Sequence, residues 1–270
     1  MRMRATLYLC LVLVLSQQAF SQELEDNPLF PRPRARRIFI GPMIGYNDNF
    51  NTGNFLTLGG PVSGIPDCGE FNQGSGNGLL FGLTAEYWFK EGGPTSLQFR
   101  VYYEQKPGTF NSTGSTEPYF DPNLNNGAGG DVYFYPLRNV QSKYNLINFE
   151  VQYKYNLPGL PHFGVAIGPK FGLVSSSNYV QTQTLLPAPG TSGTFDFAGL
   201  GSNEQTIVPS GPISGASAFR LGLIGSIQYE ALLGPLLVTP RISYDYGVTK
   251  VVSAWQINSL IGSIEFKYGL

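Results

Sequence analysis

The sequence predicts an all-β protein: an eight-stranded antiparallel up-and-down transmembrane β-barrel with short turns at one end and long loops at the other. Three observations lead to this fold class. Apolar and polar side chains alternate with a period of two in eight segments, the links between segments are alternately short and long, and a secretory leader begins the chain. We expect the apolar strand faces to contact lipid and the polar faces to line the lumen.

The leader, residues 1–21, is predicted to be a signal peptide. Two arginines precede the apolar run Leu7–Leu15, and Ala19-Phe20-Ser21 supplies the small residues that precede a cleavage site. The apolar run is too short to cross a membrane as a helix, and no later stretch approaches about 18 continuous apolar residues. The mature chain is therefore expected to begin near Gln22.

A Pro- and Arg-rich arm, residues 22–36, follows the leader. It is predicted to be a solvated tether, and the alternative is a contact with anionic lipid, peptidoglycan or a periplasmic protein. Because the leader carries Cys10, the mature chain retains Cys68 alone and has no intramolecular disulfide. Cys68 is expected to be a loop thiol without a function.

The composition is typical of a membrane barrel. Charged residues make up 13% of the chain and aromatic residues 14%, with 16 Tyr and 19 Phe. The whole chain has 17 basic and 18 acidic residues, and the leader removes Arg2 and Arg4 but no acid. The mature chain is therefore mildly acidic, which gives no electrostatic basis for binding nucleic acid.

The eight strands are defined by alternation along residues 37–270. They are expected at Arg37–Asn47, Gly78–Lys90, Ser96–Gln105, Tyr144–Leu157, His162–Ser175, Ala218–Leu232, Leu236–Tyr246 and Trp255–Leu270. The second of them contains LLFGLTAEYWFK, whose length is close to the roughly 9–11 tilted residues of a membrane-spanning strand. In the second, third, fourth and eighth strands the charged residues share one face, and they are Glu86, Lys90, Arg100, Glu104, Glu150, Lys154, Glu265 and Lys267.

The links between strands carry topological information. The tight links are rich in Gly and Pro, and they are Glu91–Thr95, Pro158–Pro161 and Leu233–Pro235. The other links are Asp48–Asn77, Lys106–Lys143, Ser176–Ser217 and Gly247–Ala254, and most are long. Barrels of the bacterial outer membrane have short periplasmic turns and long external loops, so both termini are predicted to lie in the periplasm.

Charged residues on the polar faces are predicted to form a network inside the lumen, because at the membrane midplane an exposed Lys or Arg costs about 2–4 kcal/mol. The predicted network comprises Glu86, Arg100, Glu104, Glu150, Lys154, Lys170, Arg220, Glu230, Arg241, Asp245, Glu265 and Lys267. Eight strands enclose a space just wide enough for side chains. A paired interior is therefore expected rather than a wide channel.

Aromatic residues cluster near the strand ends, where barrels place girdles at the two membrane interfaces. The predicted girdle residues are Tyr46, Tyr87, Phe89, Tyr103, Tyr153, Tyr155, Phe163, Phe219, Tyr229, Tyr244, Tyr246, Phe266 and Tyr268. The alternative is that strands simply favour Tyr and Phe.

The carboxyl end, GSIEFKYGL, resembles the signal that the barrel assembly machinery reads. Its pattern is a glycine followed by alternating apolar residues, namely Gly262, Ile264, Phe266, Tyr268 and Leu270, with Leu in place of the usual terminal Phe. With the alternation and the links, the mature chain resembles the small outer-membrane β-barrels of Gram-negative bacteria, the superfamily of OmpA-like and OmpX-like barrels. The resemblance implies outer-membrane lipids and the assembly machinery as partners; barrels of this superfamily differ widely in function.

The sequence predicts a non-enzymatic role and no catalytic, cofactor-binding or metal-binding residues. Its one histidine, His162, falls at a predicted periplasmic turn, away from the external edge where barrel enzymes place a base. We expect a role in envelope integrity or in surface interaction through the long loops, with an envelope or surface protein as a candidate partner. The alternatives are a narrow pore or transporter for small or apolar solutes, and a component of an envelope or secretion assembly.

A soluble lipocalin-like barrel is the main alternative fold, since it also closes eight strands and is secreted. It would turn the apolar faces inward. The aromatic edges, the unequal links and the carboxyl-terminal pattern favour the membrane barrel.

Overall fold

The computed structural model describes residues 37–55, 71–90, 93–113, 117–121, 130–160, 162–187, 203–233, 236–252 and 255–270. These residues belong to one compact unit, Arg37–Leu270. The predicted leader, the arm and Cys68 lie outside the described residues. Within the described part of the chain no helix has the length and hydropathy needed to cross a membrane.

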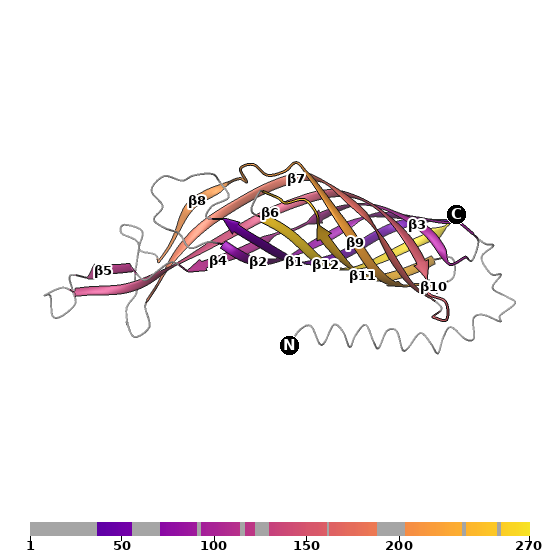
Figure 1. Ribbon diagram of the computed structural model, residues 1–270, viewed down its shortest axis with the longest axis horizontal. Coiled ribbons are helices and arrows are strands. Elements are labelled where there is room, and N and C mark those ends of the chain that lie inside the picture. The colour runs from indigo at the N-terminus through magenta and orange to yellow at the C-terminus, as the bar shows by residue number, and fades with distance from the viewer. Residues whose placement is uncertain are drawn as a thin grey trace. The chain divides into compact units, whose positions relative to one another are not determined.

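The described secondary structure is β-strand (Figure 1). The strands are β1 (Ile38–Phe55), β2 (Phe71–Trp88), β3 (Thr95–Gln105), β4 (Gly108–Thr113), β5 (Glu117–Asp121), β6 (Gly130–Asn156), β7 (Phe163–Pro187), β8 (Glu204–Pro212), β9 (Phe219–Tyr229), β10 (Ala231–Leu233), β11 (Leu236–Gly247) and β12 (Trp255–Gly269).

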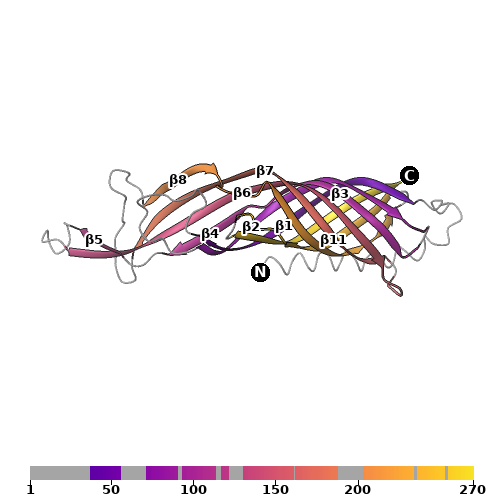
Figure 2. The same cartoon turned by 45° about the horizontal axis from the view of Figure 1, so that its top comes forward.

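Eight strands pair in a closed antiparallel ring, in the order β1, β2, β3, β6, β7, β9, β11, β12 and back to β1 (Figure 2). This ring confirms the predicted eight-stranded up-and-down barrel. The stagger of the strands is found by starting at Ile38 on β1 and moving from each residue to its partner on the next strand. After one circuit of the ring this path returns to β1 at Asp48, so the strands are staggered by ten residues.

Three of the predicted loops are in part strand, which corrects the sequence analysis. The range Asp48–Asn77 contains the end of β1 and the start of β2, Lys106–Lys143 contains β4, β5 and the first half of β6, and Ser176–Ser217 contains β8 and the end of β7. Together β4, β5, β8, residues 130–144 of β6 and residues 174–187 of β7 form a sheet beyond the ring, which we call the extension (Figure 1). The period of two is not visible in the sequence of these segments because their buried face mixes polar and apolar residues, such as Arg138, Val140 and Ser142 of β6.

The two faces of the ring are inverted relative to a soluble protein. Most of its large apolar side chains point outward, as in Leu83, Ile227 and Ile242, which are 59%, 60% and 60% exposed. The twelve predicted lumen charges are all buried. A continuous apolar outer face of this kind marks a surface that is covered in the working protein.

Candidate functional site: the closed lumen

A first ion-pair network fills the lumen near the tight turns. It joins four acids and four bases and is therefore charge-balanced; its members are Glu86, Arg100, Glu150, Lys154, Glu230, Arg241, Glu265 and Lys267. Arg100 lies 2.6 Å from both Glu150 and Glu265, on opposite sides of the ring. Such charges are stable inside a protein only when each is paired and hydrogen-bonded.

A second network lies farther along the lumen, towards the extension. Glu104 and Asp245 contact three bases, and Lys170 lies 2.7 and 2.9 Å from these two acids. Arg220 reaches Asp245 at 3.0 Å and donates to the carbonyl oxygen of Ile257 at 2.9 Å. The third base is Lys106, which contacts both acids at 3.0 and 3.1 Å.

Lys106 is a buried lumen residue that the sequence analysis missed. The sequence analysis predicts a strand that ends at Gln105 and a loop that begins at Lys106. Its signal was the continued alternation of Tyr102, Glu104 and Lys106, which places all three on the same face. Lys90 is the opposite case: the alternation of β2 predicts that it faces the lumen, but it is exposed because it lies past the end of β2.

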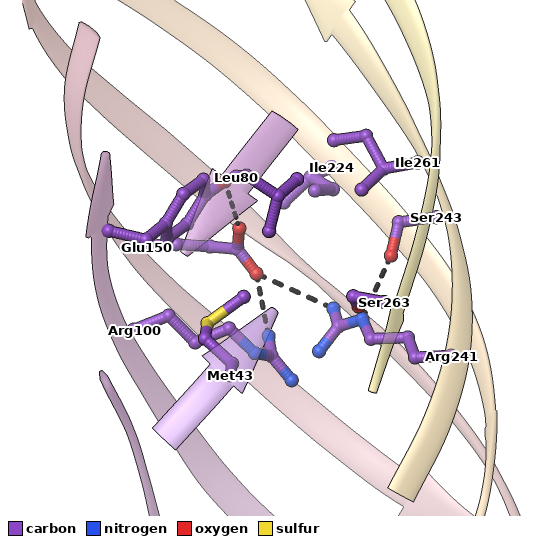
Figure 3. A pocket seen from close by; sticks show the side chains of 10 residues that line it. Met43, Leu80, Arg100, Glu150, Ile224, Arg241, Ser243, Ile261 and Ser263 are labelled. Atoms are coloured by element: carbon purple, nitrogen blue, oxygen red, sulfur yellow. Dashed lines mark hydrogen bonds and ion pairs between the residues drawn. The ribbon is translucent and has the colours of Figure 1, made fainter. Parts of the chain in front are cut away.

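An apolar layer separates the two networks. On β3, for example, the inward residue Tyr102 of the layer lies between Arg100 of the first network and Glu104 of the second. The layer consists of Met43, Leu80, Tyr102, Ile224 and Ile261, all buried. The space that remains between it and the first network is about 10 Å³, which is room for about one water molecule (Figure 3). Figure 3 shows the side chains of Arg100, Arg241 and Glu150 converging on this space.

An aromatic cap closes the lumen beyond the second network. Trp255 is fully buried, and its ring lies 5.6 Å from that of Phe110 and 6.1 Å from that of Tyr144. The Trp255 Nε1 donates to Asn51 Oδ1 at 3.0 Å. The cap comprises Phe55, Phe71, Phe110, Val140, Tyr144, Leu146, Tyr179, Ile213, Val251, Trp255 and Ile257. Several of these residues fall in predicted loops, so the sequence analysis did not identify the cap.

The structure places the predicted girdle residues on the outer face. Most are exposed, whereas Tyr103, Phe163 and Tyr229 are half-buried. Near the tight turns some rings touch across strands, with centroids 6.2 Å apart for Phe89 and Tyr153 and 5.0 Å apart for Phe163 and Tyr229. Contact with a membrane interface remains a prediction for all of them.

The predicted assembly signal lies on β12, the strand that closes the ring against β1. Gly262, Ile264, Phe266, Tyr268 and Leu270 are exposed on the outer face. Ile264 pairs with Ile44, and the Leu270 amide donates to the carbonyl oxygen of Ile38 at 2.9 Å. The recognition of this segment by assembly machinery remains a prediction.

His162 is exposed in the turn between β6 and β7, with a positive φ of 75°, and its ring lies 5.8 Å from that of Tyr229. Within the described ranges no three His, Cys, Asp or Glu side chains gather as a metal site. The lumen charges are paired with one another rather than aimed at a space for substrate. The described geometry therefore favours a structural lumen.

No protein-family model and no curated protein matches the sequence. Solved structures do match, among them the attachment invasion locus protein Ail of Yersinia pestis, at 9% identity over 86% of this chain and 99% of that chain, with a TM-score of 0.34. The outer membrane protein OprG of Pseudomonas aeruginosa matches at 14% identity over 87% and 97%, with a TM-score of 0.28.

The outer membrane protease OmpT of Escherichia coli matches at 9% identity over 88% of this chain and 98% of that chain, with a TM-score of 0.32. These matches include both a protease and proteins not described as enzymes. At these identities and TM-scores they assign no role to this chain.

Proposed function

We propose that this protein is a non-enzymatic barrel of the bacterial outer membrane whose lumen is sealed and whose extension acts at the cell surface. Both termini then lie in the periplasm, on the side of the tight turns. The observation that carries the proposal is the pairing of an exposed apolar outer face with a filled, ion-paired lumen. A barrel of this kind is an anchor that supports envelope integrity or surface interaction.

The orientation of the two faces supports insertion in a membrane. In a soluble ligand-binding barrel the apolar face lines the cavity, whereas here charged side chains occupy the interior and Leu, Ile and Phe cover the outside. Closure of the ring satisfies the strand backbone internally, as hydrocarbon requires. The soluble alternative is therefore disfavoured by the chain's own geometry.

The filled lumen supports an anchor over a pore. Two ion-pair networks, the apolar layer and the aromatic cap follow one another along the lumen, and the space next to the layer holds about one water molecule. In planar bilayers we expect no steady conductance above that of a matched preparation from cells lacking the protein. A stable ohmic conductance in proportion to the protein added would contradict a sealed lumen and favour the narrow pore.

The extension is the part of the described chain that we propose binds other molecules. Asn111 pairs with Asn139 and Tyr179 with Gly211, so short turns that replace residues 112–138 and 181–208 would leave the ring and the cap residues in place. We expect this variant to remain in the outer-membrane fraction and to keep its gel shift on heating. Binding to surface partners, or envelope resistance, should be lost.

The control for that variant is the parent chain prepared in parallel. If the shortened protein is inserted and heat-modifiable but every surface and envelope phenotype is unchanged, the proposed role of the extension is wrong. Recovery of the parent chain in the soluble periplasm, without a gel shift, would contradict the membrane barrel itself.

A further inference from the structure

Two strands on opposite sides of the ring share a sequence motif. β1 contains Ile40-Gly41-Pro42 and then Gly45, and β7 contains Ile167-Gly168-Pro169 and then Gly172. In each case the proline points outward and the two glycines face the lumen. The shared spacing aligns Gly41 with Gly168.

Two further pairs of strands match in the same way. β3 contains Arg-Val-Tyr-Tyr-Glu from Arg100 to Glu104, and β11 contains Arg-Ile-Ser-Tyr-Asp from Arg241 to Asp245. β6 ends on Gln-Tyr-Lys-Tyr-Asn before Leu157, and β12 ends on Glu-Phe-Lys-Tyr-Gly before Leu270. The third match aligns Lys154 with Lys267.

The ring order relates all three matches by one operation. β1 and β7 are the first and fifth strands of the ring, β3 and β11 are the third and seventh, and β6 and β12 are the fourth and eighth. Each match is therefore a shift by four strands, or half a turn about the barrel axis. Any two amphipathic strands can resemble each other by chance, but chance would not give the same shift of four strands in all three matches.

Strand register tests the alignment independently of the sequence. Lys154 pairs with Ser96, four residues before Arg100. Lys267 pairs with Leu237, four residues before Arg241. The third and fourth strands of each half thus pair with the same relative register, although the two matches were made on separate strands.

Matching side chains also meet at the centre of the lumen, as expected close to a two-fold axis. Arg100 and Arg241 both contact Glu150, at 2.6 and 3.4 Å, and both contact Glu265, at 2.6 and 3.5 Å. Lys154 and Lys267 likewise share Glu86, at 2.7 and 2.5 Å. The four bases of the first network are therefore two corresponding pairs, whereas its acids do not correspond: the alignment places Glu150 on Ser263 and Glu265 on Gln152.

The halves differ in the register between their second and third strands, and the closed ring explains why. Gly82 and Gly222 correspond, because each pairs with the residue two positions after the aligned glycine, Gly41 or Gly168. Gly82 pairs with the residue two positions after Arg100, whereas Gly222 pairs with the residue six positions after Arg241. If the two halves had identical registers, each half would contribute five residues to the ten-residue stagger. A shift of five residues is odd and would turn the lumen face of a strand outward. The two halves therefore cannot have identical registers.

We infer that the barrel consists of two copies of one four-stranded repeat, residues 38–157 and 163–270, and that the lumen face of each copy is the docking surface for the other. Among the described residues, six ion pairs cross between the copies: Arg100–Glu265, Lys106–Asp245, Lys154–Glu230, Lys170–Glu104, Arg241–Glu150 and Lys267–Glu86. The partner of each repeat is thus a second copy of the same unit, supplied here in the same chain.

A circular permutation tests this inference in a chain that keeps all eight ring strands. Residues 1–36 are followed by 163–270, a short Gly-rich linker and 38–157, which exchanges the two repeats. The linker is short because the Leu270 amide and the Ile38 carbonyl are hydrogen-bonded at 2.9 Å. The matched control uses the same linker but opens the chain at residues 234–235, which splits the second repeat after its second strand.

On refolding in detergent, where no assembly machinery reads the end of the chain, we expect the exchanged chain to give at least about half of the parent's heat-modifiable band and the control less than about a tenth. The exchanged chain ends on Tyr153–Leu157, which repeats the pattern of Phe266–Leu270. Equal assembly of the two permutants would overturn the inference, because the repeat boundary would then be irrelevant. Failure of the exchanged chain both in cells and on refolding in detergent would overturn it as well.

Discussion

Replacement of Arg100 by methionine is expected to lower the free energy of unfolding of the barrel by about 3–5 kcal/mol, the usual cost of removing one partner from a buried ion pair. Arg100 contacts Glu150 and Glu265 at 2.6 Å each, and all three side chains are at most 2% exposed. Arg241 remains but reaches the same acids only at 3.4 and 3.5 Å. Two carboxylates would thus be left underpaired in the lumen.

The measurement is the urea midpoint of the protein folded in detergent micelles, read from the fraction that migrates as the compact form on unheated gels. Lys143→Met is the matched control, because Lys143 is an exposed base of β6. The combined variant Arg100→Met with Glu150→Gln and Glu265→Gln should recover part of the loss, since it removes the unpaired charges. An unchanged midpoint for Arg100→Met alone would show that the network does not stabilise the fold.

Alanine at Gly41 or at Gly168 is expected to prevent closure of the barrel. A Cβ atom at Gly41 would overlap the carbonyl oxygen of Phe266 on β12, and one at Gly168 would overlap that of Val151 on β6. Both obstacles are backbone atoms of the neighbouring strand, which cannot rotate away as a side chain does. We expect a cost of more than about 3 kcal/mol, the upper end of ordinary overpacking.

Gly225→Ala is the control, because an added Cβ meets nothing within 4 Å at this position. The heat-modifiable band of each variant should be compared in outer membranes and after refolding in detergent. Gly41→Ala and Gly168→Ala should lose the band in both, whereas the control should match the parent. A normal band for Gly41→Ala would mean that β1 and β12 do not approach each other as closely as described.

The fold class and the direction of each strand face follow from the local sequence. A period of two is a local property, and a charge such as Glu150 or Lys154 cannot face hydrocarbon at acceptable cost. The eight ring strands and the twelve buried charges could therefore be predicted without any knowledge of their partners. Two of the predicted short links also join strands that pair with each other, β2 with β3 and β6 with β7.

The pairing of the charges, the closure of the lumen and the position of the extension depend on the tertiary structure. Arg100 meets Glu265 across 165 residues because ring closure and a ten-residue stagger bring the lumen faces of β3 and β12 within reach of each other. Most of the cap around Trp255 comes from ranges that the sequence predicts to be loops, and the ion pair of the buried Lys106 with Asp245 joins two strands that are far apart in the chain. The reason is physical: a membrane imposes its pattern on each strand separately, whereas contacts inside the lumen depend on the register of the whole ring.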